Sequence, residues 1–86
     1  MRECDVETGY VFYHIDPGCH RSVLERVKAV RGVSAAHVVI GIWDMVVRVE
    51  AASIDALEAA YFTELNQIEG VANSRLHIVA CPRTRK

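Results

Sequence analysis

Four histidines and one cysteine are the side chains of this sequence best suited to metal binding: His14, His20, His37, His77 and Cys19. Zinc and haem sites usually bring such ligands together through i, i+4 or C-x-x-C spacing. Neither spacing occurs among these five side chains, so ordinary surface or interface roles are favoured and no metal or cofactor is predicted. One grouping stays open, because His14, His37 and His77 would gather if the first strand turned His14 toward the other two.

Two further positions could do chemistry. Cys19 stands near the start of a predicted helix, where a thiol can be activated, yet the neighbouring sequence holds no base and no second cysteine. Asp44 follows Trp43 in a short break between two strands. This pair has two interpretations: a tight turn in which Asp44 accepts local amides, or a ligand site. No catalytic residue is predicted, and we expect a protein that is not an enzyme.

Length and composition predict one small domain that associates with itself. The chain has 86 residues, of which 51% are hydrophobic, and a domain this small has much surface on which apolar residues must lie. Ten basic residues against eleven acidic ones give a net charge of −1, which provides no positive field for nucleic acid. The basic residues of the tail 82–86 are typical of a solvated chain end.

The cysteines and the chain start favour the cytoplasm. Cys4, Cys19 and Cys81 are an odd number without paired spacing, as expected of free thiols in a reducing compartment. The first residues mix charges and lack the apolar core of a leader peptide, and no run of about 18 apolar residues predicts a membrane span. We therefore expect a soluble protein that is not exported.

Hydrophobic periodicity predicts six elements, bounded by glycine, proline and capping residues. Asp16 is the predicted N-cap and Pro17 the first residue of helix one, and Ser53 is the predicted N-cap of helix two. A tight hairpin joins the second and third strands. The elements are a strand over 9–15, a helix from Pro17 to about Val30, strands over 34–40 and 45–50, a helix ending at Gly70, and a strand over 71–80.

An internal echo supports this order, because Val30–Val39 aligns without gaps with Ile68–His77. Two right-handed β-α-β halves joined by a hairpin predict an α+β, ferredoxin-like sandwich, with a four-stranded antiparallel sheet and two helices on one face. Alternation assigns side chains of the later strands to the two faces, but it leaves the first strand unassigned. The predicted helix-covered face holds Ala36, Val38, Ile40, Met45, Val47, Val49, Leu76 and Ile78; the predicted open face holds His37, Val39, Val46, Arg48, Arg75, His77 and Val79. The open face is half apolar, which favours packing against a second copy.

The chain resembles the effector domain of the Lrp/AsnC family of transcriptional regulators, the RAM domain. The matching residues are Gly32-Val33, the hairpin 39–50 with its Gly41-Ile42-Trp43-Asp44 break, and Gly70-Val71. The resemblance divides the chain into an extension over 1–8, the effector domain over 9–81 and the basic tail over 82–86. Only eight residues precede the first predicted strand, so the chain is similar to stand-alone members without a helix-turn-helix domain.

The resemblance implies a dimeric α+β barrel, assembly of dimers into a higher oligomer, and an amino acid or similar small effector bound where dimers meet. The implied ligand-binding residues are Gly41, which lets the ligand approach the backbone, Trp43 where the family often has tyrosine, Asp44 and the Ser74 hydroxyl. Leu76 stands where the family commonly has threonine. Full-length regulators of the same family are the implied protein partners, with no direct contact to nucleic acid or membrane.

Two other functions stay open on the residues alone. Related dimeric α+β barrels include small monooxygenases and isomerases, whose pocket lies between the sheet and the helices of one subunit. A purely structural oligomerisation module is the third possibility. Fold cannot choose among these, because the same fold carries many functions.

Overall fold

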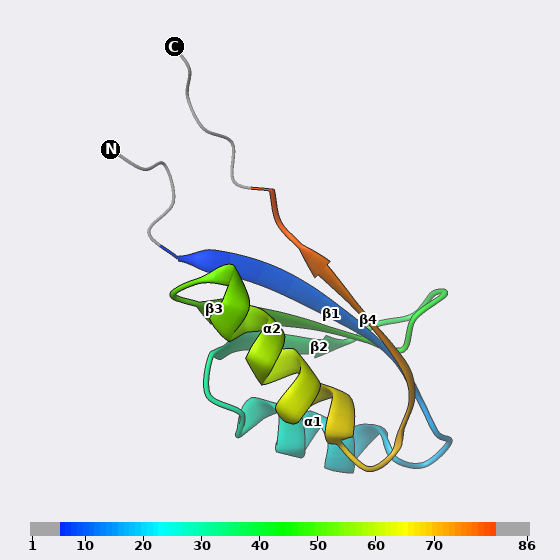
Figure 1. Cartoon of the computed structure of the whole chain (residues 1–86). Helices are drawn as coiled ribbons and strands as arrows, with labels where there is room; N and C mark the ends of the chain where they lie inside the picture. The colour runs from blue at the N-terminus through cyan, green and yellow to red at the C-terminus, as the bar shows by residue number, and fades with distance from the viewer. Residues whose placement is uncertain (1–5, 81–86) are drawn as a thin grey trace.

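A computed structural model of the chain describes residues 6–80, and all structural statements below concern these residues. The element order is β-α-β-β-α-β, as predicted, with one added short 3-10 helix (Figure 1). The elements are β1 (Glu7–Ile15), α1 (His20–Lys28), β2 (Val33–Val38), β3 (Met45–Ala51), α2 (Ile54–Thr63), the 3-10 helix η1 (Leu65–Gln67) and β4 (Val71–Ile78).

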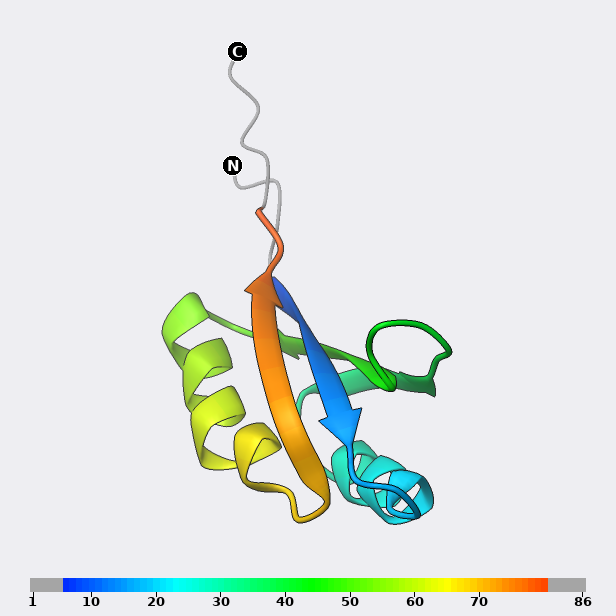
Figure 2. The same ribbon diagram turned by 90° about the vertical axis from the view of Figure 1, so that its right-hand side faces the viewer.

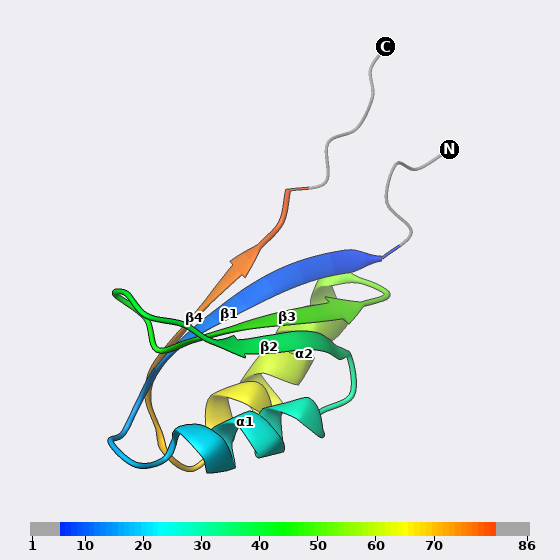
Figure 3. The same cartoon turned by 180° about the vertical axis from the view of Figure 1, so that it is seen from behind.

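The four strands form one antiparallel sheet in the order β2-β3-β1-β4. Figure 2 shows β1 and β4 side by side and running in opposite directions. Both helices lie on one face of the sheet, and no helix covers the other face (Figures 1 and 3). This confirms the predicted ferredoxin-like fold. No helix within residues 6–80 is long and apolar enough to span a membrane.

Both Gly-Val turns have the backbone conformation that their glycines suggested. Gly32 and Gly70 have φ angles of +96° and +101°, in the left-handed region where a side chain is strained. A Cβ atom at Gly32 would also come within 2.8 Å of the Glu50 carbonyl oxygen. Each helix therefore returns to the sheet through a turn that favours glycine, which accounts for the repeated sequence.

The hydrophobic core lies between the sheet and the helices, and the central strand β1 divides its side chains cleanly between core and open face. Val11, Tyr13 and Ile15 are buried, whereas the alternate residues of β1 are only partly buried. The structure thus resolves the assignment that alternation left open. The core consists of Val11, Tyr13, Ile15, Val23, Val27, Met45, Val47, Val49, Leu57, Tyr61, Leu65 and Ile68.

Tyr13 carries the buried polar group at the centre of this core. Its hydroxyl donates a hydrogen bond of 2.5 Å to the Leu65 carbonyl oxygen, which ties β1 to η1. Burial raises the pKa of the Tyr13 phenol well above its usual range, and the nearby Tyr61 adds to this effect. The phenol therefore stays protonated and remains a donor.

The start of helix one differs from the prediction. Asp16 is not its N-cap and Pro17 is not helical, because residues 16–19 form a turn in which the Cys19 amide donates to the Asp16 carbonyl oxygen at 3.0 Å. The helix begins at His20 and ends at Lys28, and Cys19 is an N-cap without a side-chain hydrogen bond. An Asp-Pro pair suits a turn as well as a helix start, so the local signal was ambiguous.

The link between β2 and β3 is a six-residue loop rather than a tight hairpin. The ladder ends at the pair of Val38 with Met45, so the predicted strand over 34–40 is too long at its end. Ile40 was predicted to lie beneath the helices, but it is fully exposed in this loop at 104% of its reference area. Val38 was also assigned to that face and is half exposed, because it ends an edge strand.

Helix two begins as predicted and ends earlier than predicted. The Ser53 hydroxyl accepts a hydrogen bond from the Ala56 amide at 3.1 Å, which confirms Ser53 as the N-cap. The α-helix stops at Thr63, and the tighter η1 replaces the continuation to Gly70. This change of pitch keeps Leu65 and Ile68 buried in the core. The last strand ends at Ile78 instead of Ala80.

Replacing Tyr13 with phenylalanine should destabilise the domain by about 1–2 kcal/mol at pH 7, because the buried Leu65 carbonyl loses its donor. Tyr10→Phe is the matched control, since Tyr10 is only partly buried on the other face of β1, and it should change stability little. Urea denaturation followed by circular dichroism measures both. Equal stability of the Tyr13→Phe and Tyr10→Phe variants would show that the buried bond contributes nothing.

The stabilities of the wild type and the Tyr13→Phe variant should converge in alkali. An unfolded tyrosine ionises near about pH 10, whereas folded Tyr13 stays protonated, so above that pH the folded state binds more protons. The unfolding free energy of the wild type should therefore fall as the pH rises above about 10, and Tyr13→Phe lacks this contribution. The stability advantage of the wild type over Tyr13→Phe should therefore shrink as the pH rises above about 10, which urea denaturation at a series of pH values measures.

Candidate functional site

Residues 39–44, called the hairpin loop below, project beyond the end of the sheet (Figure 3). The Val39 amide donates to the Asp44 carbonyl oxygen at 2.9 Å, which closes the base of the loop, and the Asp44 amide donates to the Tyr13 carbonyl oxygen at 2.8 Å. At the tip, Ile40 and Ile42 are exposed at 104% and 84%. The loop therefore has a fixed base and an uncovered apolar tip.

The carboxylate of Asp44 anchors the loop to the central strand. Its Oδ2 atom accepts a hydrogen bond of 2.9 Å from the Ile15 amide, at the irregularity where the pairing of β1 with β4 shifts between His14 and Ile15. The acceptor role expected of a turn aspartate is present, but the amide belongs to a strand 29 residues away along the chain. Asp44 thus fixes the position of the loop relative to β1.

Trp43 lies over the open face of the sheet. Its ring stacks on the His14 ring with centroids 4.2 Å apart and planes inclined by 22°, and it lies 5.9 Å from the Phe12 ring. Phe12 in turn meets His77 edge-on at 5.3 Å. We call these four side chains the aromatic row. His14 also places Nε2 at 2.7 Å from the Ile42 carbonyl oxygen, so one imidazole contacts two residues of the loop.

Ser74 lies on the opposite face of the sheet from Trp43. Its Oγ atom donates to Asn66 Oδ1 at 2.7 Å and lies 2.7 Å from the Tyr61 hydroxyl of α2, which donates to it. Leu76, two residues along β4, packs against the core on the same helix-covered face. The structure therefore brings Gly41, Trp43 and Asp44 together in one loop and does not bring Ser74 to it within a single chain.

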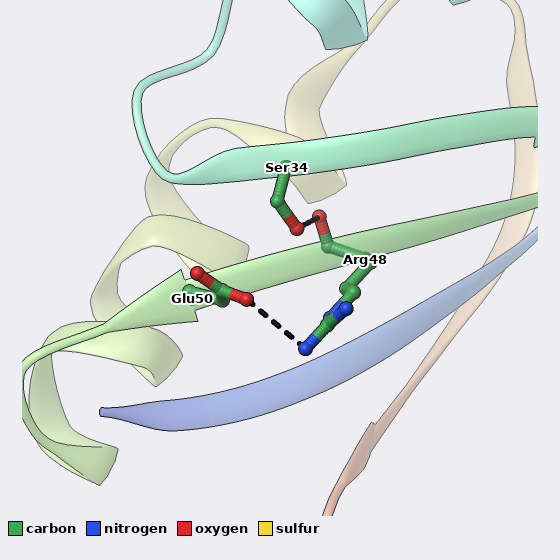
Figure 4. Close-up of polar contacts among 3 residues, drawn as sticks. All are labelled: Ser34, Arg48 and Glu50. Carbon is green, nitrogen blue, oxygen red and sulfur yellow. Dashed lines mark hydrogen bonds and ion pairs between the residues drawn. The ribbon is translucent and has the colours of Figure 1, made fainter. Parts of the chain in front are cut away.

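The rest of the open face carries a mixture of charged and apolar groups. Arg48 forms an ion pair of 3.1 Å with Glu50, and the Ser34 hydroxyl donates to the Arg48 carbonyl oxygen at 3.4 Å (Figure 4). Ser34 is the extra residue where the pairing of β2 with β3 shifts. The open face is therefore polar around Arg48 and Glu50 and aromatic near the hairpin loop.

The described residues hold no cluster of metal ligands. Within residues 6–80, no three His, Cys, Asp or Glu side chains lie close enough together to hold a metal ion. His14, His37 and His77 come from three different strands, and His14 and His77 contact Trp43 and Phe12 instead of one another. Cys19 is a free, partly buried thiol. Cys4, Cys81 and the basic tail lie outside the described residues.

Comparison with known proteins identifies the family. A model of the Lrp/AsnC ligand binding domain matches residues 8–82. The chain belongs to this family. An uncharacterized HTH-type transcriptional regulator of Pyrococcus furiosus, PF0250, is 29% identical over 70 residues, which are 78% of this chain and 47% of that protein. The chain thus spans about half the length of this relative.

Solved structures show the same fold. The crystal structure of FFRP-DM1 superposes with a TM-score of 0.81 at 23% identity, covering 86% of this chain and 99% of that one. The transcriptional regulator NMB0573 of Neisseria meningitidis, solved as a complex with L-Met, gives a TM-score of 0.77 at 13% identity, covering 86% of this chain and 49% of that protein. At these identities the likeness is one of fold.

A groove of about 600 Å³ occurs elsewhere on this Lrp/AsnC domain, between α2 and the end of β3. Four alanines of α2 and β3 line it, together with Arg31, Gly32, Glu50, Thr63 and Glu64. The lining includes no histidine, cysteine or serine that could act as a nucleophile with its base.

The sequence predicted Trp43 and Asp44 as residues of the hairpin loop site. It did not predict that His14 and Phe12 contact Trp43. The motif around Gly41 marked the loop, but both sets of alternate residues in the first strand are largely apolar. The signal that could have found His14 is cross-strand pairing, because Tyr10 lies opposite Arg48 and His77, both already assigned to the open face.

Replacing Asp44 with alanine should destabilise the domain by about 1–2 kcal/mol, because the Ile15 amide loses its acceptor. Asp44→Asn keeps an oxygen acceptor at the same place and should recover at least half of the loss. Glu69→Ala, in an exposed turn, is the control and should be nearly neutral. Chemical denaturation at pH 7 measures all three. If Asp44→Ala matches the wild type, the carboxylate does not anchor the loop.

Proposed function

We propose that this chain is a non-enzymatic sensing and assembly module, which binds an amino acid or a similar small effector at the hairpin loop where two dimers meet. It would modulate transcription in the cytoplasm through partner regulators of the same family. The observation that carries the proposal is a loop with a firmly held base and an exposed tip, since Asp44 and Trp43 are fixed on β1 while Ile40 and Ile42 contact solvent.

The exposed tip favours an interface at the loop. Ile40 and Ile42, on either side of Gly41, are two β-branched side chains with no cover, and exposed apolar groups of this kind indicate a contact surface. A loop that is already held in position loses little conformational freedom when a partner or ligand binds, which favours affinity. Assembly of dimers through this tip would enclose the backbone of Gly41 and create a site that a single chain lacks.

The polar groups near the loop suit an amino acid. Carbonyl oxygens of the loop and the Asp44 carboxylate can accept from an ammonium group, and the backbone at Gly41 leaves room for close approach, since a Cβ there would meet nothing within 4 Å. The L-Met complex of the related fold NMB0573 supports this ligand class. Ser74 stays a predicted contact, with Tyr61 and Asn66 competing for its hydroxyl.

The open face supports dimerisation through the sheet. Phe12 and Val46 are neighbours across β1 and β3, with His37 of β2 and Arg75 of β4 at the ends of the same row, so a strip with an apolar centre crosses the face. Charged groups such as Arg48 flank this strip. A second copy would cover the strip and leave the charged groups near the rim, which is the usual anatomy of a protein interface.

An amino acid that binds should raise the melting temperature in a thermal-shift screen of the wild type, by mass action. Gly41→Ala should remove most of this shift. Gly18→Ala is the matched control, because Gly18 and Gly41 both have positive φ (+83° and +158°) and neither Cβ would have a neighbour within 4 Å. Both variants should lose about 1 kcal/mol of stability, but only Gly41→Ala should lose the ligand. A ligand that stabilises both variants equally would place its site elsewhere.

Val46→Lys should convert the dimer to a monomer, because it places a charge in the middle of the strip. Ile54→Lys is the control, since Ile54 is 45% exposed at the start of α2 on the other side of the sheet. Size-exclusion chromatography with light scattering distinguishes the two masses. A Val46→Lys protein that stays dimeric at micromolar concentration would exclude the open face as the dimer interface.

A further inference from the structure

We propose that His14 is a positioning residue for the effector site: it holds the hairpin loop through Trp43 and Ile42, and its protonation tightens this hold. The inference rests on the proposed function in one respect, namely that the loop binds the effector. Its physical basis is independent of any ligand, because it consists of contacts within the chain.

Three consecutive residues at the end of β1 hold three consecutive residues of the loop. The Tyr13 carbonyl accepts from the Asp44 amide at 2.8 Å, and the Ile15 amide donates to the Asp44 carboxylate at 2.9 Å. Between these two backbone contacts, the His14 ring covers Trp43 at 4.2 Å and meets the Ile42 carbonyl oxygen at 2.7 Å. His14 is the only one of the three that acts through its side chain, so it is the one that pH can change.

The Ile42 carbonyl fixes the protonation of one ring nitrogen. A carbonyl oxygen only accepts, so Nε2 must carry a proton whenever the 2.7 Å contact is a hydrogen bond. A second proton on Nδ1 leaves this donor in place and makes the bond charge-assisted. The same proton turns the stack on Trp43 into a contact between a cation and an indole ring, which adds attraction. Both effects make the loop more firmly held at lower pH.

Other charged groups also face this part of the sheet. Asp44 lies in the loop itself, and its carboxylate accepts from the amide of Ile15, the residue after His14. The neighbouring strands add further basic and titratable side chains to this face of the sheet. These groups are His37 on β2, Arg48 on β3, and Arg75 and His77 on β4.

Trp43 supplies a direct readout, because it is the only tryptophan of the chain. A protonated imidazole in contact with an indole quenches its fluorescence, and imidazoles gain their proton between about pH 8 and 5. Wild-type emission should therefore fall over this range. His14→Phe keeps a stacking ring without a donor, and His14→Gln keeps a donor without the ring; both should lose the pH-dependent change. His37→Gln, on the same face without a contact to Trp43, should retain it.

Effector affinity tests the positioning role, using whichever amino acid gives the largest thermal shift with the wild type. His14→Ala should weaken its binding on the order of tenfold at pH 6, the loss expected for one hydrogen bond and one ring contact. His14→Gln and His14→Phe should each recover part of this. All proteins are compared at a concentration where light scattering gives them the same mass, so that subunit dissociation changes neither the measured affinity nor the tryptophan emission.

The outcomes separate this inference from the proposed function. The contact between His14 and Trp43 would be falsified by wild-type emission that does not change with pH. The same holds if the emission of His14→Gln changes with pH as that of the wild type does. Equal ligand affinity of the wild type and His14→Ala would overturn the positioning role. If emission follows His14 while no amino acid binds, the hold is supported and the effector function fails.

Discussion

The alternation of side chains along β1 is the constraint on which the rest of the structure depends. β1 is the central strand that pairs with both β3 and β4, so its register sets that of the sheet. Tyr13 points into the core and binds the Leu65 carbonyl, whereas His14 points to the open face and binds the loop. A shift of one residue would exchange these two side chains and place an imidazole where a buried phenol now holds η1.

The topology was predictable because several independent signals agree on it. Helical periodicity, strand alternation and the two Gly-Val turns each indicate the same order, and the turns have the positive φ angles that glycine favours. The ends of helices and strands were less predictable, because the same short sequence can form either a turn or the end of a helix. Asp16 and Pro17 satisfy the rules for both a turn and a helix start, and only the surrounding structure selects the turn. The change of pitch after Thr63 likewise reflects a tertiary demand, the burial of Leu65 and Ile68.

The candidate site was predictable only where its residues are contiguous. Gly41, Trp43 and Asp44 form a recognisable motif in one loop, but the residues that hold the loop lie 28 and 29 positions away. No pattern in the first strand distinguishes Tyr10, Phe12 and His14 from their neighbours, because aromatic and β-branched residues occupy both faces. Ser74 shows the converse problem, since its family position was clear but its hydroxyl already bonds to Tyr61 and Asn66.

The aromatic row connects the two surfaces that the proposed function uses. His14 and Trp43 lie at the loop, and Phe12 contacts both Trp43 and His77. Phe12 and His77 belong to the face that we propose packs against a second copy. In the proposed function, a ligand that moves Trp43 would change its contact with Phe12, since the two ring centroids lie 5.9 Å apart. If ligand binding at the loop alters dimer affinity in this way, thermodynamic linkage requires dimerisation to alter ligand affinity by the same factor. In the proposed function, sensing and assembly would thus be coupled through the four side chains of the aromatic row rather than through a change of fold.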